Sequence, residues 1–118
     1  VGNLFCGGEK AGLLVGHTEA MVTGALAGHN AVRQLAGREM LVLPASLACG
    51  DAIRYVRERM LTDDGMRVKY TFSGSVYFTR MKELGLYSAD AAQIHARVEA
   101  AGLTGVMARA VAPAAVAA

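Results

Sequence analysis

The apolar and polar residues of this chain follow the period of an α-helix over most of its length. The clearest such segment is 18–35, whose apolar or small residues recur three or four positions apart: Met21, Ala25, Gly28, Val32 and Leu35. This spacing predicts a long amphipathic helix with that stripe buried. Similar patterns predict further helices over 47–61, 76–84 and 88–101, with N-caps at Ser46 and Ser88.

Two shorter segments have the pattern of β-strands. The apolar run 4–6 is typical of the end of a buried strand. In 67–72, apolar and aromatic residues alternate with basic ones, which predicts a strand with one basic face. Its expected partner is the apolar run 40–43, and the alternative is an extended segment laid over the helices. The predicted fold class is therefore mainly α, a small helical bundle with one or two short strands.

Glycines at a strand–helix junction indicate a possible ligand site near the N-terminus. Gly7 and Gly8 follow the first apolar run, and Gly16 precedes the long helix that starts near Thr18. Glycine lets a backbone approach a ligand closely, and the helix start offers free N–H groups to phosphate or another electron-rich group. The alternative is an ordinary junction with no ligand. Glu19 lies in the first turn of this helix. A carboxylate that interacts with the helix dipole explains it as well as a cofactor contact does.

The same residues carry a family resemblance. The chain reads N-L-F-x-G-G-E, then a glycine-bearing loop, then T-E-A-x-x-x-G-x-x-A-G-x-N-A-x-R, over residues 3–33. This resembles the last FAD-contacting segment of the glucose-inhibited division protein A family, which comprises tRNA-uridine-modifying flavoproteins, and of the related folate-dependent tRNA methyltransferase flavoproteins. In those proteins the segment is a strand, a loop and a helix whose start lies against the flavin.

The resemblance implies an FAD site in the first quarter of the chain. Together with the glycines, it gives these cofactor-binding candidates: Gly7, Gly8, Glu9, Gly16, Thr18, Glu19 and Ala20. Glu9 stands where the family usually has Gln, and the loop is about one residue longer. Because of those departures, membership of a relative is an alternative to membership of the named tRNA enzymes.

The resemblance also implies a domain organisation. Residues 1–37 would be the last strand–loop–helix segment of an FAD-binding α/β domain, and 38–118 a C-terminal helical region. The chain starts with an apolar run and lacks the G-x-G-x-x-G fingerprint of an FAD-binding fold, so we expect the C-terminal part of a longer flavoprotein. Its expected partners are the rest of that protein, tRNA and a second copy. Alone, we expect it to be inactive and to bind FAD weakly or not at all.

Composition and charge narrow the other function classes. Hydrophobic residues make up 53% and charged residues 19%, so we expect part of the surface to be covered by another structure. The net charge of +2 is too small to argue by itself for a nucleic-acid partner. No membrane span, signal peptide or metal-ligand spacing is visible, and Cys6 and Cys49 form no CxxC motif. A reducing cytoplasm is therefore the expected location.

No catalytic residue can be assigned from the sequence. His17 precedes the long helix, but no partner carboxylate or nucleophile can be paired with it, so a capping or solvated histidine is expected. The rival function class is a helical binding module, from Ser46 onward, for RNA or a protein partner. Arg54, Arg57 and Arg59 would serve that module, although a solvated helix face explains them more simply.

Overall fold

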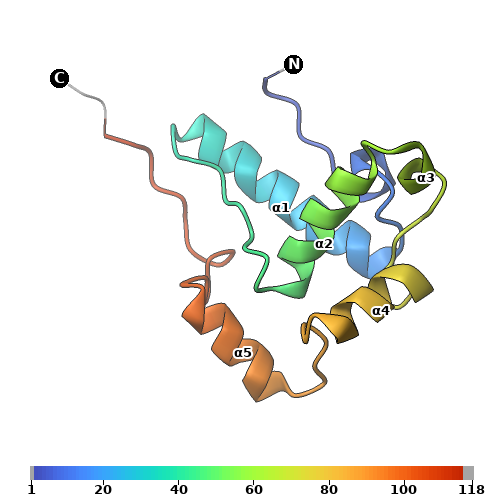
Figure 1. Cartoon of the computed structure of the whole chain (residues 1–118). Helices are drawn as coiled ribbons and strands as arrows, with labels where there is room; N and C mark the ends of the chain where they lie inside the picture. The colour runs from blue at the N-terminus through green and yellow to red at the C-terminus, as the bar shows by residue number, and fades with distance from the viewer. Residues whose placement is uncertain (1, 116–118) are drawn as a thin grey trace.

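The protein is mainly helical in its computed structural model, which describes residues 2–115 (Figure 1). Val1 and residues 116–118 therefore lie outside the description of the two predicted regions. The elements follow one another along the chain as a short 3-10 helix and five α-helices: η1 (Gly8–Ala11), α1 (His17–Leu35), α2 (Ala48–Arg59), α3 (Asp63–Met66), α4 (Ser75–Glu83) and α5 (Ala91–Ala100). The four predicted helices are thus present, and α3 is an additional single helical turn.

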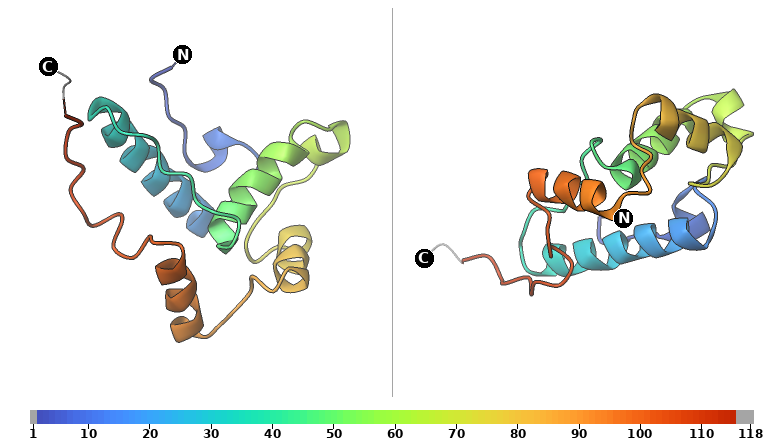
Figure 2. Two further views of the ribbon diagram at one scale, coloured as in Figure 1. Left: turned by 60° about the vertical axis from the view of Figure 1, so that its left-hand side comes forward. Right: turned by 90° about the horizontal axis from the view of Figure 1, so that it is seen from below.

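The predicted fold class, a small and mainly helical domain, is confirmed, and the helices are arranged openly around the core. The long helix α1 lies on one side, α2 and α4 on the other, and α5 stands at the edge (Figures 1 and 2). The tail after α5 runs back beside the C-terminal end of α1, where the Ala114 N–H donates to the Ala36 carbonyl at 2.7 Å. The molecule is flat, with extents of 52 × 37 × 21 Å.

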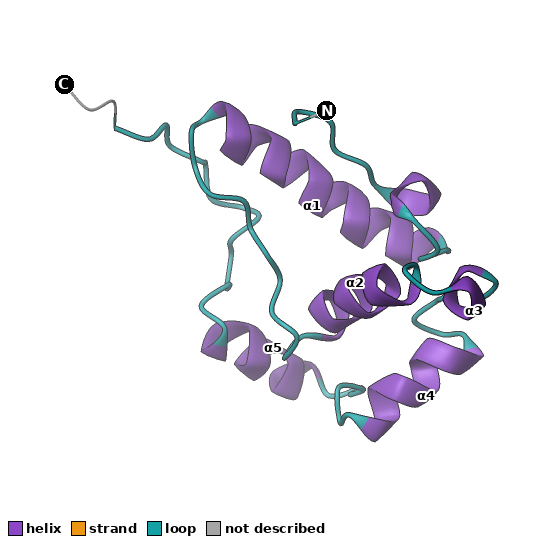
Figure 3. Ribbon diagram, turned by 45° about the horizontal axis from the view of Figure 1, so that its top comes forward, coloured by secondary structure: helices purple, strands orange, loops and turns teal. Residues whose placement is uncertain are grey.

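Neither predicted strand forms within residues 2–115 (Figure 3). The run 4–6 is irregular, and Leu4 is 68% exposed. Only a one-residue parallel bridge forms, between Tyr70 and Leu14. The Tyr70 N–H donates to the Leu13 carbonyl at 2.8 Å and the Val15 N–H donates to the Tyr70 carbonyl at 2.9 Å. The alternative prediction, an extended segment laid over helices, is the better description of 67–72.

The prediction that 40–43 pairs with 67–72 as a strand is wrong, and the structure shows the reason. The side-chain amide of Asn30 bonds both backbone groups of Leu41: Nδ2 donates to the Leu41 carbonyl at 3.0 Å, and Oδ1 accepts from the Leu41 N–H at 2.6 Å. A side chain of α1 thus takes the place of a neighbouring strand, which satisfies the polar groups of this connection.

The hydrophobic core lies between α2, α4 and the segment around Tyr70. Its buried members are Leu14, Ala52, Val56, Tyr70, Tyr77 and Met81. Tyr55 packs edge-on against Tyr70 with ring centroids 5.7 Å apart, and Phe72 packs against Tyr77 at 5.9 Å. Such edge-to-face pairs add to the stabilisation from burial alone.

The face of α1 that was predicted to be buried is exposed. Met21 is 67% exposed, Val32 50% and Leu35 90%, whereas the buried residues of this helix are polar: Glu19, Thr23 and Asn30. The polar side is turned inward because its side chains bond the backbones of three irregular segments. The predicted apolar stripe therefore has no partner among residues 2–115.

The C-terminal helix α5 also departs from its prediction. None of its residues is buried, and Ile94 is 42% exposed. Its N-cap is Asp90 rather than Ser88, because the Asp90 carboxylate accepts from the Ala92 N–H at 2.9 Å. Likewise, Leu47 rather than Ser46 precedes α2, with no side-chain cap.

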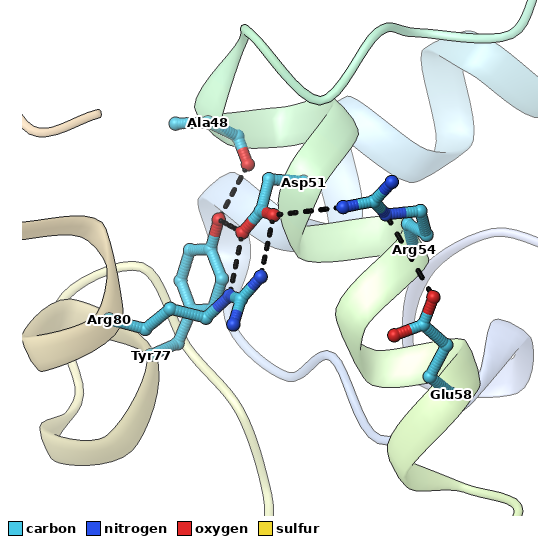
Figure 4. A network of polar contacts seen from close by, with 6 residues as sticks. All are labelled: Ala48, Asp51, Arg54, Glu58, Tyr77 and Arg80. Carbon is cyan, nitrogen blue, oxygen red and sulfur yellow. Dashed lines mark hydrogen bonds and ion pairs between the residues drawn. The ribbon is translucent and has the colours of Figure 1, made fainter. Parts of the chain in front are cut away.

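A buried carboxylate fastens α2 to α4 (Figure 4). Asp51, 1% exposed, accepts two hydrogen bonds of 2.9 Å from the Arg80 guanidinium. The Tyr77 hydroxyl lies 2.9 Å from the same carboxylate. Hydrogen bonding to Arg80 holds the pKa of Asp51 below its usual value, while burial raises the pKa of Tyr77. Arg80 also lies 4.3 Å from the centre of the Tyr55 ring.

Candidate cofactor-binding segment

Gly7 allows the N-terminal loop to rest directly on the backbone of α1 at Gly24. A Cβ atom on Gly7 would lie 2.7 Å from Cα and 2.9 Å from N of Gly24, closer than any real contact. Gly7 itself has an ordinary extended backbone, φ −129°. Its requirement for glycine is therefore the close approach of the two segments. The Cβ position of Gly24 has no atoms within 4 Å, so this contact requires glycine at Gly7 and does not require it at Gly24.

Thr23 connects the glycine loop to the helix. The Gly8 N–H donates to Thr23 Oγ1 at 2.7 Å, and that hydroxyl donates to the Glu19 carbonyl at 2.8 Å. Gly8 has φ +65°, and a Cβ there would lie 3.6 Å from the Ala20 Cβ. Sequence reasoning missed Thr23, although a β-branched polar residue one turn into the helix and next to Gly24 was an available signal.

The start of α1 is open. Its N-cap is Gly16 at φ +131°, and no side chain caps it. The first hydrogen bond of the helix runs from the Ala20 N–H to the Gly16 carbonyl at 2.9 Å. The preceding N–H groups of His17, Thr18 and Glu19 have no protein acceptor in the described chain. His17 and Thr18 are exposed. This helix end can therefore receive an electron-rich or anionic group from outside.

Glu19 points inward from the same turn. It is 4% exposed, and its Oε1 accepts a hydrogen bond from the Phe72 N–H at 2.5 Å. The other carboxylate oxygen lies against Gly16, where any side chain would collide with it. Glu19 thus ties the helix start to the segment around Tyr70, and Gly16 is required both by its backbone conformation and by that carboxylate.

The seven cofactor candidates fall into two adjacent groups. Gly7, Gly8 and Glu9 lie at the start of η1, which packs against α1, and the remaining four form the start of α1 itself. Glu9, Gly16, Thr18 and Ala20 are exposed, Gly7 and Gly8 are partly exposed, and Glu19 is buried. The structure therefore brings the candidates together, and it turns all but one of them at least partly to the outside.

An apolar pocket of about 480 Å³ lies beside this segment. Thr18 and Val22 contribute one wall from α1, and the opposite walls come from residues between Leu47 and Val98. Its lining includes Cys49, whose thiol pKa is raised by burial, so the thiol is held protonated. The two predicted regions thus share this pocket.

The described residues offer little other candidate chemistry. They contain no group of three His, Cys, Asp or Glu side chains placed to hold a metal ion. Cys6 and Cys49 are both free thiols. Among residues 2–115, no helix combines the length and apolar character needed to cross a membrane.

Comparison with known proteins gives one match. The family model described as Glucose inhibited division protein A matches residues 1–39. No curated protein and no solved structure matches the chain. The matched residues include η1, the glycine loop and the whole of α1. A relationship to the Glucose inhibited division protein A family is therefore supported for the segment that carries all seven candidates.

Proposed function

We propose that this chain supplies one wall of the FAD site of an oxidoreductase related to the Glucose inhibited division protein A family. The observation that carries the proposal is the open start of α1. Three of its N–H groups have no acceptor among residues 2–115, and the glycine loop is fixed beside them. It lies within the residues that the family matches.

The residues present fit such a cofactor. Gly8 and Gly16 bring no side chain of their own to this segment, and the helix dipole favours an electron-rich group at the exposed start of α1. Glu19 and Thr23 act as positioning residues, since each holds a neighbouring segment against the helix. When bound, the flavin supplies the hydride or electron transfer. The protein groups that complete the reaction are not assigned to this chain.

The exposed side of α1 supports a larger assembly around this segment. The whole chain has an accessible surface of 7870 Å² at a mass of 12.3 kDa. A compact monomer of this mass exposes about 6,100 Å². The apolar stripe with Met21, Val32 and Leu35 is part of that surplus. We assign the cover of this stripe to the rest of a flavin-binding domain, with residues 1–37 as its last segment and 38–118 as a helical region.

The finer assignments rest on the family relationship. We propose uridine modification in tRNA as the reaction of the complete protein, and the cytoplasm as its location. The two free cysteines are in keeping with a reducing compartment. In the isolated 118-residue chain, we expect weak or no FAD binding, because most cofactor contacts would come from other parts of the protein.

The test is the visible absorption spectrum of the intact flavoprotein, purified without added cofactor. Gly8→Val should remove the flavin absorption, because a branched side chain would stand at the exposed loop in front of the helix start. Gly85→Val is the matched control. Gly85 has φ +67° against +65° for Gly8, so the backbone strain is alike, and no atoms lie within 4 Å of its Cβ position. Equal flavin content in the two variants would overturn the proposal.

The second candidate, a helical binding module for RNA, has less support from the arginines that suggested it. Arg54 lies 3.9 Å from both Asp51 and Glu58, and Arg59 is partly buried. Only Arg57 of the three is exposed without an ion pair in the described chain. RNA binding that weakens steeply with salt and is lost on Arg57→Ala would favour this candidate.

A further inference from the structure

A basic pocket lies at the opposite end of α1 from the proposed cofactor segment. Its volume is about 300 Å³, and its charged lining consists of Arg33 in α1, Arg38 in the following turn and Arg109 in the tail, with His29 beside them. The tail and the end of α1 lie side by side in both views of Figure 2. His29 and Arg33 lie about three to four and a half turns past the helix start at His17, which is about 18–24 Å along the helix at roughly 1.5 Å per residue.

The pocket collects positive charge that no side-chain carboxylate of residues 2–115 neutralises. Neither Asp nor Glu belongs to its lining. The ion pairs in the described part of the chain join residues of α2 and α4 only, so Arg33, Arg38 and Arg109 take part in none. The negative end of the α1 dipole amounts to about half a charge. Three guanidinium groups outweigh it.

Two of the arginines are held in place by bonds that leave most of their donors unused. Arg33 Nε donates to His29 Nε2 at 2.8 Å and its Nη1 to the Glu39 carbonyl at 3.2 Å. Arg38 donates to the Ala112 and Pro113 carbonyls at 2.9 and 3.2 Å. A guanidinium has about five N–H donors, so each retains several. The groups are therefore preorganised for a further acceptor.

We propose that this pocket binds a small phosphate-bearing anion such as pyrophosphate. Arginine pairs bidentately with phosphate oxygens, and charge-assisted bonds of this kind are the strongest hydrogen bonds in proteins. The volume suits a small anion, and the apolar lining of Val106 and Val111 shields the charges from water on one side. Because the tail contributes Arg109 and the carbonyls that hold Arg38, the anion would also fasten the tail to α1.

The experiment is a calorimetric titration of the full 118-residue chain with sodium pyrophosphate at low salt. Arg109→Ala should weaken binding about tenfold, the effect of losing a charge-assisted bond. The Arg109 side chain donates no hydrogen bond within the described residues, and its backbone bond to the Gly105 carbonyl is kept in Arg109→Ala. The substitution should therefore leave the fold intact, and circular dichroism checks this. Arg67→Ala is the matched control: it removes the same charge from an exposed residue outside the pocket and should change the affinity less than about twofold.

Three results would overturn the assignment. The first is no heat of binding at millimolar pyrophosphate. The second is an equal loss of affinity in Arg109→Ala and Arg67→Ala, which would indicate diffuse charge instead of a site. The third comes from a parallel titration with a 12-nucleotide uridine RNA. If the RNA binds more tightly than pyrophosphate and loses that advantage in Arg109→Ala, the phosphate belongs to a polynucleotide and not to a small anion.

Discussion

The two halves of this molecule are built on opposite plans. Around η1 and α1, polar side chains face inward and an apolar stripe faces outward, and the contacts are made largely by backbone. Around α2 and α4, aromatic and aliphatic side chains form a closed core, crossed by the Asp51–Arg80 pair. The first half matches a family of known proteins over residues 1–39, and the second half lies outside that match.

This difference shows what each half requires from its surroundings. The core between α2 and α4 buries Ala52, Val56, Tyr77 and Met81, and the Arg80 guanidinium pairs with the buried Asp51 carboxylate. By contrast, α1 depends on Glu19, Thr23 and Asn30 to hold neighbouring segments, while its apolar stripe has no partner within residues 2–115. A helix of this kind is suited to a position between a cofactor at its start and other protein along its outer face.

Among the substitutions that test this difference, the largest loss of stability should come from breaking the buried ion pair between α2 and α4. Asp51→Ala removes the partner of Arg80 and of the Tyr77 hydroxyl, and should lower the free energy of unfolding by about 3 kcal/mol. Urea denaturation of the 118-residue chain measures this. Glu83→Ala, an exposed change in α4, is the control and should cost under about 0.5 kcal/mol. Equal effects of the two would show that α2 and α4 are held by apolar packing alone.

The same carboxylate predicts loss of stability in acid. Because its pKa in the folded protein is lowered, Asp51 stabilises the fold fully above its unfolded pKa of about 3.9 and loses that contribution as the pH falls through the lower folded value. Urea titrations between pH 3 and pH 7 should therefore show a fall in stability below about pH 4. Asp51→Asn should have a lower but flatter profile. Parallel profiles would assign the acid sensitivity to other carboxylates.

A smaller effect should follow from separating the glycine loop from α1. Gly7→Ala places a methyl group 2.7 Å from the Gly24 Cα, with no gain or loss of backbone strain, and should cost about 2 kcal/mol. Gly2→Ala is the control, since no atoms lie near its Cβ position. Hydrogen exchange should become faster in η1 and α1 and stay unchanged in α2. Uniform acceleration in both halves would show that they unfold as one unit.

The smallest effect should come from Thr23→Val, which keeps the shape and removes the hydroxyl. The Gly8 N–H then loses its acceptor, at a cost of about 1 kcal/mol. Thr79→Val, on the exposed face of α4, is the matched control and should be nearly neutral. An unchanged unfolding midpoint in Thr23→Val would mean that close backbone packing at Gly7 alone fixes the loop.

Helix positions were predictable from the sequence, but helix orientation was not. The apolar spacing located α1 to within a residue, yet it indicated the wrong buried face, because burial of that helix is decided by hydrogen bonds from Glu19, Thr23 and Asn30 to distant segments. The strand prediction for 67–72 failed for a related reason. Alternation correctly placed Tyr70 inside, but the Asn30 amide occupies the backbone of Leu41 and excludes it as a partner.

For the candidate site, the sequence was informative where conformation is local. Gly8 and Gly16 do adopt positive φ, and the helix does begin beside them. The inward turn of Glu19 was not foreseeable, since its partner is the backbone of Phe72, 53 residues away. The basic pocket was missed as well, because Arg109 meets Arg33 and Arg38 only through the return of the tail.

The most direct test of the central claim is Thr18→Glu in the intact flavoprotein, followed by flavin content and melting temperature together. A carboxylate in the first turn favours the helix itself, because it interacts well with the N-terminal dipole. The claim that this open helix start faces FAD predicts loss of most of the bound flavin with unchanged or improved helix stability. Retention of flavin at the wild-type ratio would contradict it, because an added negative charge would then be tolerated where the cofactor is proposed to lie.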